Sequence, residues 1–182
     1  MAVNEMVISQ VAVQDVQADV VVVRVLEDGS FARGLQALDE VSGGFFARQA
    51  KLGNLPRKVG RAVMFVEVEG VEAQRVLVVC ADKKKKDLKK AVAQVLEEVK
   101  RFECATVALA MFDGVAEREA QLALQWVLGG CYAFEECKSE SKLKDGDFSL
   151  AQVRWVVCVC EKGRSSWRGL WRGRWPGLKG RF

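Results

Sequence analysis

The chain is 182 residues long, half of its residues are hydrophobic, and its formal net charge is +4 at pH 7. This length suits one domain of ordinary size, and the apolar content allows a core to form without disulfides or metal. The positive charge is local, because six basic residues and no acid follow Gly163, which leaves 22 basic and 24 acidic residues in 1–163. The body of the chain is therefore weakly acidic, and the basicity belongs to its end.

The residues that most often bind metal or act as general bases are scarce. Histidine is absent, and the six cysteines form no C-x-x-C pair. Four of them lie in apolar runs, where a thiol usually acts as a small buried hydrophobe. We therefore expect reduced, structural cysteines and no metal or cofactor in this chain. The six are Cys80, Cys104, Cys131, Cys137, Cys158 and Cys160.

Nothing in the printed sequence predicts secretion or insertion into a membrane. The first ten residues, MAVNEMVISQ, lack a basic region followed by an apolar core. No apolar run approaches the roughly 20 residues that a spanning helix needs. We expect a cytoplasmic protein without a membrane partner.

Six apolar segments predict strands. The strongest are 18–26, with five valines, and 75–81, a continuous apolar run that ends at Asp82. Because 75–81 has no polar alternation, we expect it to be covered on both faces and to lie at the centre of a sheet. Residues 62–68 precede it as a mostly buried strand, joined to it by a turn at 69–72. The other segments are 6–9, a short edge strand, 105–112 and 150–160.

Helical periodicity appears between these strands. Helices are expected from residue 32 to Gly43-Gly44, over 45–52, from a cap at Asp82 or Asp87 to about Phe102, and from about Ala116. Gly129-Gly130 weakens the last helix, and periodicity leaves open whether 131–134 continues it or begins a strand. The alternation of strands and helices predicts the α/β class, with a mostly parallel sheet between helices.

The lysines after the central strand could contact phosphates. They are Lys83, Lys84, Lys85, Lys86, Lys89 and Lys90. A solvated helix start is the favoured interpretation, because aromatic or glycine partners are missing and Glu97 and Glu98 follow on the same helix.

Two other patterns are candidates for sites. Gly43-Gly44 and the strand end 79–82 could border a ligand site outside the carboxyl ends of strands, but neither forms a G-x-G-x-x-G or a P-loop. Paired carboxylates occur at 97–98, 135–136 and at Asp145 with Asp147, where surface solvation is favoured over metal or acid–base chemistry.

The last segment, 163–182, departs from this pattern. Trp, Arg and Gly make up most of residues 167–182, without helical or strand periodicity. The side chains could stack on single-stranded nucleic acid and neutralise its phosphates. These three amino acids also share GG-containing codons, so a GC-rich gene read out of frame would give the same composition, which is the interpretation we favour.

Several short segments resemble one family in their order and spacing. The chain reads LDEVSGG at 38–44, then Gly53, KVG at 58–60, RVLVV at 75–79 and YAFE at 132–135. Together they are similar to the amino-terminal domain of the leucyl (cytosol) aminopeptidases over about residues 17–160. The sequence departs from the family at 80–82, where glycines are usual, and at Glu135, which replaces Asp.

The resemblance implies a three-layer α/β/α, macro-domain-like fold with a mixed, mostly parallel sheet, and it places 131–134 in a helix. Family members are aminopeptidases with two zinc or manganese ions, whose ligands and catalytic residues lie in a carboxyl-terminal domain around an Asn-Thr-Asp-Ala-Glu-Gly-Arg segment. This sequence contains no such segment. The resemblance therefore assigns no catalytic, cofactor or metal residue to any position here.

The resulting hypothesis divides the chain into an aminopeptidase amino-terminal domain, 1–162, and an irregular tail, 163–182, for which an out-of-frame origin is the favoured interpretation. We expect a truncated or frameshifted product that is inactive by itself. In the family its partners would be the catalytic domain and a homo-oligomer. The alternatives are a stand-alone macro-like module for a nucleotide and a nucleic-acid-binding protein that uses the tail.

Overall fold

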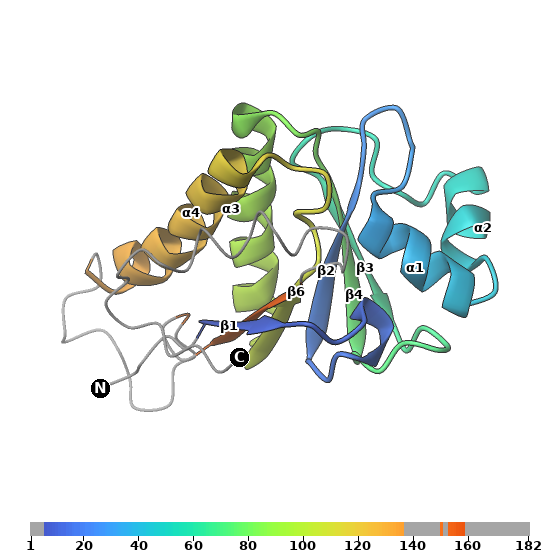
Figure 1. Cartoon of the computed structure of the whole chain (residues 1–182), viewed down its shortest axis with the longest axis horizontal. Coiled ribbons are helices and arrows are strands. Elements are labelled where there is room, and N and C mark those ends of the chain that lie inside the picture. The colour runs from blue at the N-terminus through green and yellow to red at the C-terminus, as the bar shows by residue number, and fades with distance from the viewer. Residues whose placement is uncertain (1–5, 137–149, 151–152, 159–182) are drawn as a thin grey trace.

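A six-stranded sheet runs through the molecule in the order β1-β6-β5-β2-β4-β3 (Figure 1). The computed structural model describes residues 6–136, 150 and 153–158. Each neighbouring pair of strands is parallel except β3 and β4, which are antiparallel. The strands are β1 Met6–Ser9, β2 Val20–Val25, β3 Ala62–Val66, β4 Arg75–Cys80, β5 Thr106–Leu109 and β6 Arg154–Cys158.

Helices cover both faces of this sheet (Figure 1). On one face lie α1 Arg33–Val41 and α2 Phe45–Lys51, and on the other lie α3 Lys85–Arg101 and α4 Glu117–Glu136. A short 3-10 helix, η1 Val13–Asp15, precedes β2. The mixed, mostly parallel sheet between two helical layers is the α/β/α fold expected from the sequence.

The valine-rich strands build both halves of the core. In β2, Val20 and Val22 belong to the layer under α3 and α4, whereas Val21 and Val23 belong to the layer under α1 and α2. This division follows from the alternation of side chains along a strand. Because helices cover both layers, a polar side chain is not required on either face, and all six residues of β2 are buried.

Most predicted elements are confirmed, and three details differ. Strand β4 is buried but lies one strand from the edge, because β3 is the edge strand, and β3 is partly rather than mostly buried. The cap of α3 is Lys84, without a side-chain hydrogen bond, so neither predicted aspartate caps this helix. The carboxylate of Asp82 accepts a hydrogen bond from the backbone of Glu27 instead, at 3.2 Å.

Helix α4 continues through Gly129 and Gly130 to Glu136. The segment 131–134 is thus helical, as the family resemblance implied. The predicted loop 138–147, residues 151–152 and 159–160 of the predicted strand and the tail lie outside the described residues. Leu150 is described and is not in a strand, so the last strand begins at Arg154 and not at residue 150 as predicted. Within the part of the chain that the structure describes, no helix combines the length and apolar character needed to cross a membrane.

The two adjacent glycines of α4 give a testable contrast. A Cβ on Gly129 would meet no atom within 4 Å, whereas a Cβ on Gly130 would overlap Leu96 Cδ1 on α3. We expect Gly129→Ala to raise the free energy of unfolding by about 0.5–1 kcal/mol, because alanine loses less backbone entropy in a helix. Gly130→Ala should lose this gain, because Leu96 must move out of the contact between α3 and α4.

Urea denaturation followed by circular dichroism measures both variants. The same single methyl group is added in each case, so each variant is the matched control for the other. Equal stability of the two variants would contradict the close packing of α3 against α4 at Gly130.

Candidate functional site

The carboxyl ends of β2, β4 and β5 meet at one edge of the sheet. In open α/β sheets, ligands bind outside this edge, so it is the first place to look for a site. Three connections leave from it, 26–32 after β2, 81–84 after β4 and 110–116 after β5. We call them the carboxyl-edge loops.

Arg24 lies within the sheet just below these loops, and it is only 1% exposed. Its Nε donates to Met111 O at 3.0 Å, Nη1 to Ala81 O at 3.2 Å and Nη2 to Asp113 O at 2.6 Å. One planar guanidinium therefore joins β2 to the segments that follow β4 and β5. These bonds satisfy backbone carbonyls that the sheet ladder no longer pairs.

Two carboxylates balance the buried charge of Arg24 from a distance. Burial lowers the pKa of the Arg24 guanidinium from its usual value, and the charges of Asp113 and Asp82 oppose this shift. Arginine stays protonated in proteins, so the site holds a permanent positive charge. The charge is directed at carbonyl oxygens of the chain itself.

Asp113 connects the same edge to helix α1. Its Oδ2 accepts a hydrogen bond from the backbone of Gly34 at 3.1 Å, in the first turn of α1. Burial raises the pKa of the Asp113 carboxyl, while the bond from Gly34 and the charges of Arg33 and Arg24 act in the opposite direction. Asp113 thus supplies an anion to the helix start at some cost in solvation.

The raised pKa of Asp113 predicts a pH effect on stability. The folded state binds this proton more tightly than the unfolded chain does, so the free energy of unfolding falls as pH rises from the ordinary aspartate pKa through the raised one. In Asp113→Asn this fall is absent, while the amide oxygen can still accept from Gly34. We expect the variant to gain stability relative to the parent as pH rises through this window.

Denaturant unfolding of both proteins from about pH 4 to pH 7 measures the difference. Subtracting one profile from the other cancels the titration of all other groups. Asp113→Ala is the control, because it also loses the acceptor and should be less stable than Asp113→Asn by about 1 kcal/mol. Parallel profiles for the parent and Asp113→Asn would contradict the raised pKa.

The cysteine at this edge is not a reactive group. Cys80 ends β4, is fully buried and has its pKa raised to about 11, chiefly by burial. Burial also raises the pKa of Cys104, and that of Cys158 to about 12. Cys80, Cys104 and Cys158 form no disulfide, and a thiol whose pKa is raised in this way is protonated at neutral pH and inert. Cys137 and Cys160 lie outside the described residues.

The sequence candidates are dispersed over the fold. The segment 79–82 lies at the carboxyl edge, but Gly43 and Gly44 form the left-handed turn between α1 and α2. That turn is at the opposite end of the sheet, because the end of α1 contacts Gly70 in the turn between β3 and β4. The structure therefore does not bring Gly43-Gly44 close to the strand end 79–82.

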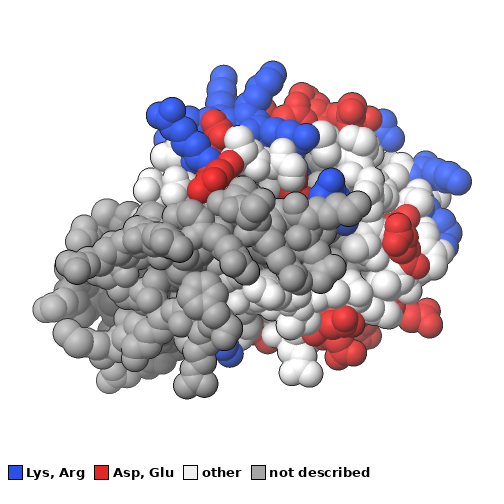
Figure 2. Space-filling view, viewed as in Figure 1, with Lys and Arg blue, Asp and Glu red and all other residues white. Residues whose placement is uncertain are grey.

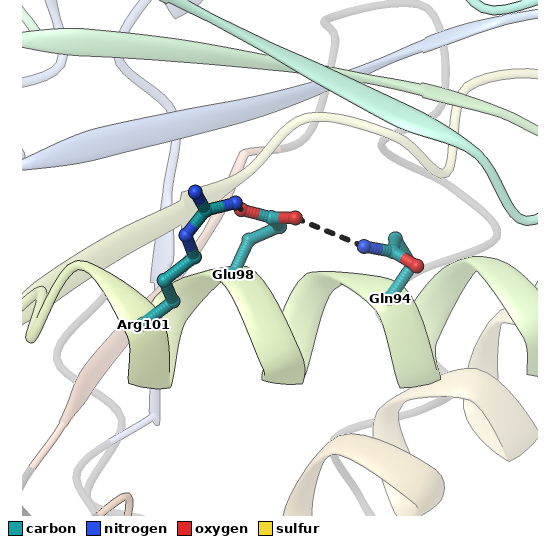
Figure 3. A network of polar contacts seen from close by, with 3 residues as sticks. All are labelled: Gln94, Glu98 and Arg101. Carbon is teal, nitrogen blue, oxygen red and sulfur yellow. Dashed lines mark hydrogen bonds and ion pairs between the residues drawn. The ribbon is translucent and has the colours of Figure 1, made fainter.

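The carboxylate pair on α3 is also not a site. Glu97 is exposed, and Glu98 accepts from Gln94 Nε2 at 3.0 Å and lies 3.9 Å from Arg101 Nη1 (Figure 3). These contacts run along one helix at spacings of three and four residues, and they contribute only a few tenths of a kcal/mol. Among the described residues, no three His, Cys, Asp or Glu side chains gather to hold a metal ion. The side chains of 135–136, Asp145 and Asp147 lie outside that part of the chain.

The predicted lysine run occupies the exposed start of α3. Lys83, Lys84, Lys85 and Lys86 are exposed, and so are Lys89 and Lys90. Sequence reasoning missed Arg24, although a single arginine among valines in a buried strand was a sign that it needed partners. No sequence pattern indicated that those partners would be backbone carbonyls.

Comparison with known proteins identifies the family. The model of the "Cytosol aminopeptidase family, N-terminal domain" matches residues 20–141. The chain belongs to this family, through its N-terminal domain. It is 30% identical over 147 residues to a probable cytosol aminopeptidase of Azoarcus sp., covering 76% of this chain and 29% of that protein. The cytosol aminopeptidase of Pseudomonas aeruginosa is 27% identical over 145 residues, again with 29% of its length covered. The chain thus spans less than a third of the length of these aminopeptidases.

Solved structures show the same fold at low sequence identity. The macro domain of ganglioside induced differentiation associated protein 2 superposes with a TM-score of 0.66 and 13% identity, over 92% of this chain and 82% of that one. A Trypanosoma brucei macrodomain in complex with ADP-ribose gives a TM-score of 0.63 and 15% identity, over 91% of this chain and 68% of that one. The aminopeptidase N-terminal domain described here therefore has a macrodomain fold.

Proposed function

We propose that this chain is the non-catalytic N-terminal part of a cytosol aminopeptidase and has no peptidase activity by itself. The observation that supports it is the position of the match, which falls in the family's N-terminal domain and covers 29% of the relatives' length. In this proposal, residues 1–162 are the domain, and 163–182 are an appended segment read out of frame. Its partners are the catalytic domain and further copies of the enzyme, in the cytoplasm.

The chemistry of metal-dependent peptide hydrolysis supports the same assignment. Two-metal aminopeptidases need clustered ligands that hold both ions and activate a water molecule. The printed sequence has no histidine and no Asn-Thr-Asp-Ala-Glu-Gly-Arg segment. We infer that zinc or manganese binds to residues outside this sequence and that this chain holds no cofactor.

A peptidase assay tests the proposal directly. The purified chain is incubated with leucine p-nitroanilide and either Zn²⁺ or Mn²⁺, with the Pseudomonas aeruginosa cytosol aminopeptidase in parallel. We expect no release of nitroaniline above the blank from the chain alone. Turnover that rises in proportion to chain concentration and disappears with a chelator would overturn the proposal.

The reading frame is tested at the gene. The DNA through and beyond the codons for 153–182 is sequenced and translated in all three frames. We expect a second frame to continue with the Asn-Thr-Asp-Ala-Glu-Gly-Arg segment. If no frame contains it, the chain is a free-standing domain rather than a frameshifted aminopeptidase.

A nucleotide-binding module is the rival function, because one of the neighbouring folds is described in complex with ADP-ribose. At 15% identity, this similarity supports a common fold but does not indicate that the two proteins bind the same ligand. In this chain the carbonyls at the carboxyl edge face the Arg24 guanidinium, which is already bonded to three of them. A calorimetric titration with ADP-ribose should give no binding heat, and a saturable isotherm would make the rival the better proposal.

The other rival, nucleic-acid binding through 163–182, is tested by deletion. The full chain and a variant that ends at residue 162 are titrated with labelled single-stranded DNA. Under our proposal the two bind equally weakly. Binding by the full chain that the deletion abolishes would assign the function to the tail.

A further inference from the structure

The lysines at the start of α3 belong to a larger basic surface. The loop 57–61 packs against them, because a Cβ on Gly60 would lie 3.1 Å from Lys90 Cβ. The same loop is tied to the end of β4 by a hydrogen bond from Gly60 N to Cys80 O of 2.9 Å. This brings three further exposed cations next to the run. We define the basic surface as Arg57, Lys58, Arg61, Lys83, Lys84, Lys85, Lys86, Lys89 and Lys90, all of them exposed.

Few acidic groups neutralise the basic surface. Asp82 is partly buried and engaged by the backbone of Glu27, and Asp87 is partly buried in the first turn of α3. Figure 2 shows the blue side chains gathered along the upper edge, with red side chains beside them. Three exposed acids lie at the same edge of the sheet: Glu27 and Asp28 in the loop after β2, and Glu117 at the start of α4. The nine cations leave a clear excess of positive charge.

An acidic surface lies at the other end of the same strands. It is centred on the turn between β3 and β4, which contacts α1, because a Cβ on Gly70 would lie 2.7 Å from Val41 O. Glu72 N donates to Gln14 O at 2.8 Å, which adds the end of η1. Cations also lie at this end of the sheet: Arg48 donates to Gly43 O, Arg75 is paired with Val66 across the β3–β4 ladder, and Arg101 lies with Arg75 over the Phe102 ring. We define the acidic surface as the exposed side chains of Asp15, Glu40, Glu67, Glu69 and Glu72.

The acidic surface includes uncovered apolar side chains. Val41 is 42% exposed and Val66 is 62% exposed, and both adjoin its glutamates in the chain. The red side chains along the lower edge of the molecule in Figure 2 lie opposite the blue ones. Strand β4, six residues long, separates the two ends by about 20 Å. Each copy therefore presents opposite charges at the two ends of its sheet.

We propose that the basic surface of one copy docks on the acidic surface of a second copy, in a head-to-tail arrangement. Charge complementarity favours a second copy as the partner, because each copy carries both the basic surface and the acidic surface. The aliphatic stems of lysine would cover Val41 and Val66 while their ammonium groups approach the glutamates. Each bound copy leaves one surface of each kind free, so assembly continues into chains or closes into a ring.

Sedimentation velocity of the full chain at low and high salt is the first test. We expect concentration-dependent species at about 50 mM salt, including some larger than a dimer, and monomer at about 500 mM, where exposed charges are screened. A chain that stays monomeric at low salt, or that associates equally at both salt concentrations, would overturn the proposal.

Complementary variants decide whether the contact is head to tail. The first is Lys85→Gln/Lys86→Gln/Lys89→Gln, and the second is Glu40→Gln/Glu69→Gln/Glu72→Gln. Each alone should self-associate at least about tenfold more weakly than the parent. An equimolar mixture should form a one-to-one complex and nothing larger, because only one intact pair of surfaces remains. Lys51→Gln/Arg118→Gln, exposed cations outside both surfaces, should behave as the parent does.

The mixing result separates this proposal from other occupants of the basic surface. If either triple variant associates as strongly as the parent, or the mixture stays monomeric, the head-to-tail contact is wrong. A labelled DNA duplex is titrated in parallel at low salt. If the parent binds the duplex more tightly than it binds itself, and the lysine variant loses that binding, the basic surface serves nucleic acid and the proposal is overturned.

Discussion

Replacing Arg24 with methionine is expected to unfold the carboxyl edge and to lower the free energy of unfolding by about 3 kcal/mol or more. Methionine fills a similar volume but donates nothing. The carbonyls of Ala81, Met111 and Asp113 would then lose their guanidinium donor in a region that excludes water. A buried acceptor that loses its donor costs about 1–3 kcal/mol, and three are affected at once. Urea denaturation followed by far-ultraviolet circular dichroism measures the loss.

Arg24→Lys separates the charge from the geometry. Lysine keeps the positive charge near Asp113 and Asp82, but its single ammonium cannot match the planar fork that reaches three carbonyls. Its stability should fall between those of the parent and Arg24→Met. If Arg24→Met is as stable as the parent, the guanidinium does not hold the edge together and the carbonyls have found other donors.

The strands could be predicted from the sequence because their own residue types indicate them. Runs such as 20–25 and 75–80 are β-branched and apolar without interruption, and only a strand covered on both faces accommodates them. Helices α1 and α3 were equally predictable from apolar positions repeating every three or four residues. Residue type and periodicity are local properties, so a short stretch of sequence is enough to predict a strand or a helix.

The order of the strands could not be read in the same way. The continuous apolar run 75–80 indicated a central strand. In the structure only β3 lies beyond it, and pairing with β3 is enough to remove β4 from the edge of the sheet. The predicted strand 105–112 ends early, at Leu109, although Ala110, Met111 and Phe112 are buried. Ala110 N still donates to Val22 O at 2.8 Å, and the backbone leaves the ladder after it, where Met111 O accepts from Arg24 instead. A contact between residues 87 positions apart leaves no periodic trace in the sequence.

The candidate site shows the same limit. The lysines of 83–90 were visible as a run, but Arg57, Lys58 and Arg61 join them only because the loop before β3 packs against α3. Asp82 was read as a helix cap, since aspartate after a strand is typical of one. The fold uses its carboxylate to fix the loop after β2. Residue type predicted the chemistry of each group, and only the fold determined its partner.

Replacing Gly34 with alanine should lower the free energy of unfolding by about 1–3 kcal/mol. Gly34 lies in the first turn of α1, where alanine is normally the better helix former. Here, however, a Cβ would lie 2.6 Å from Ala110 O and 3.4 Å from Ala110 Cβ. The obstacle is backbone of the sheet and cannot rotate away, so α1 must move outward and weaken the bond from Gly34 N to Asp113 Oδ2.

Gly129→Ala is the matched control, because the same methyl group enters open space in a helix and should stabilise. Gly34→Val should be worse than Gly34→Ala, since two more methyl groups meet the same backbone. Comparing thermal midpoints of the three variants with the parent measures the effect, and a single 1 kcal/mol change moves a domain of this size by about 2–4 °C. A Gly34→Ala protein as stable as Gly129→Ala would mean that α1 does not approach the sheet this closely, and the link from Arg24 through Asp113 to α1 would then have no structural role.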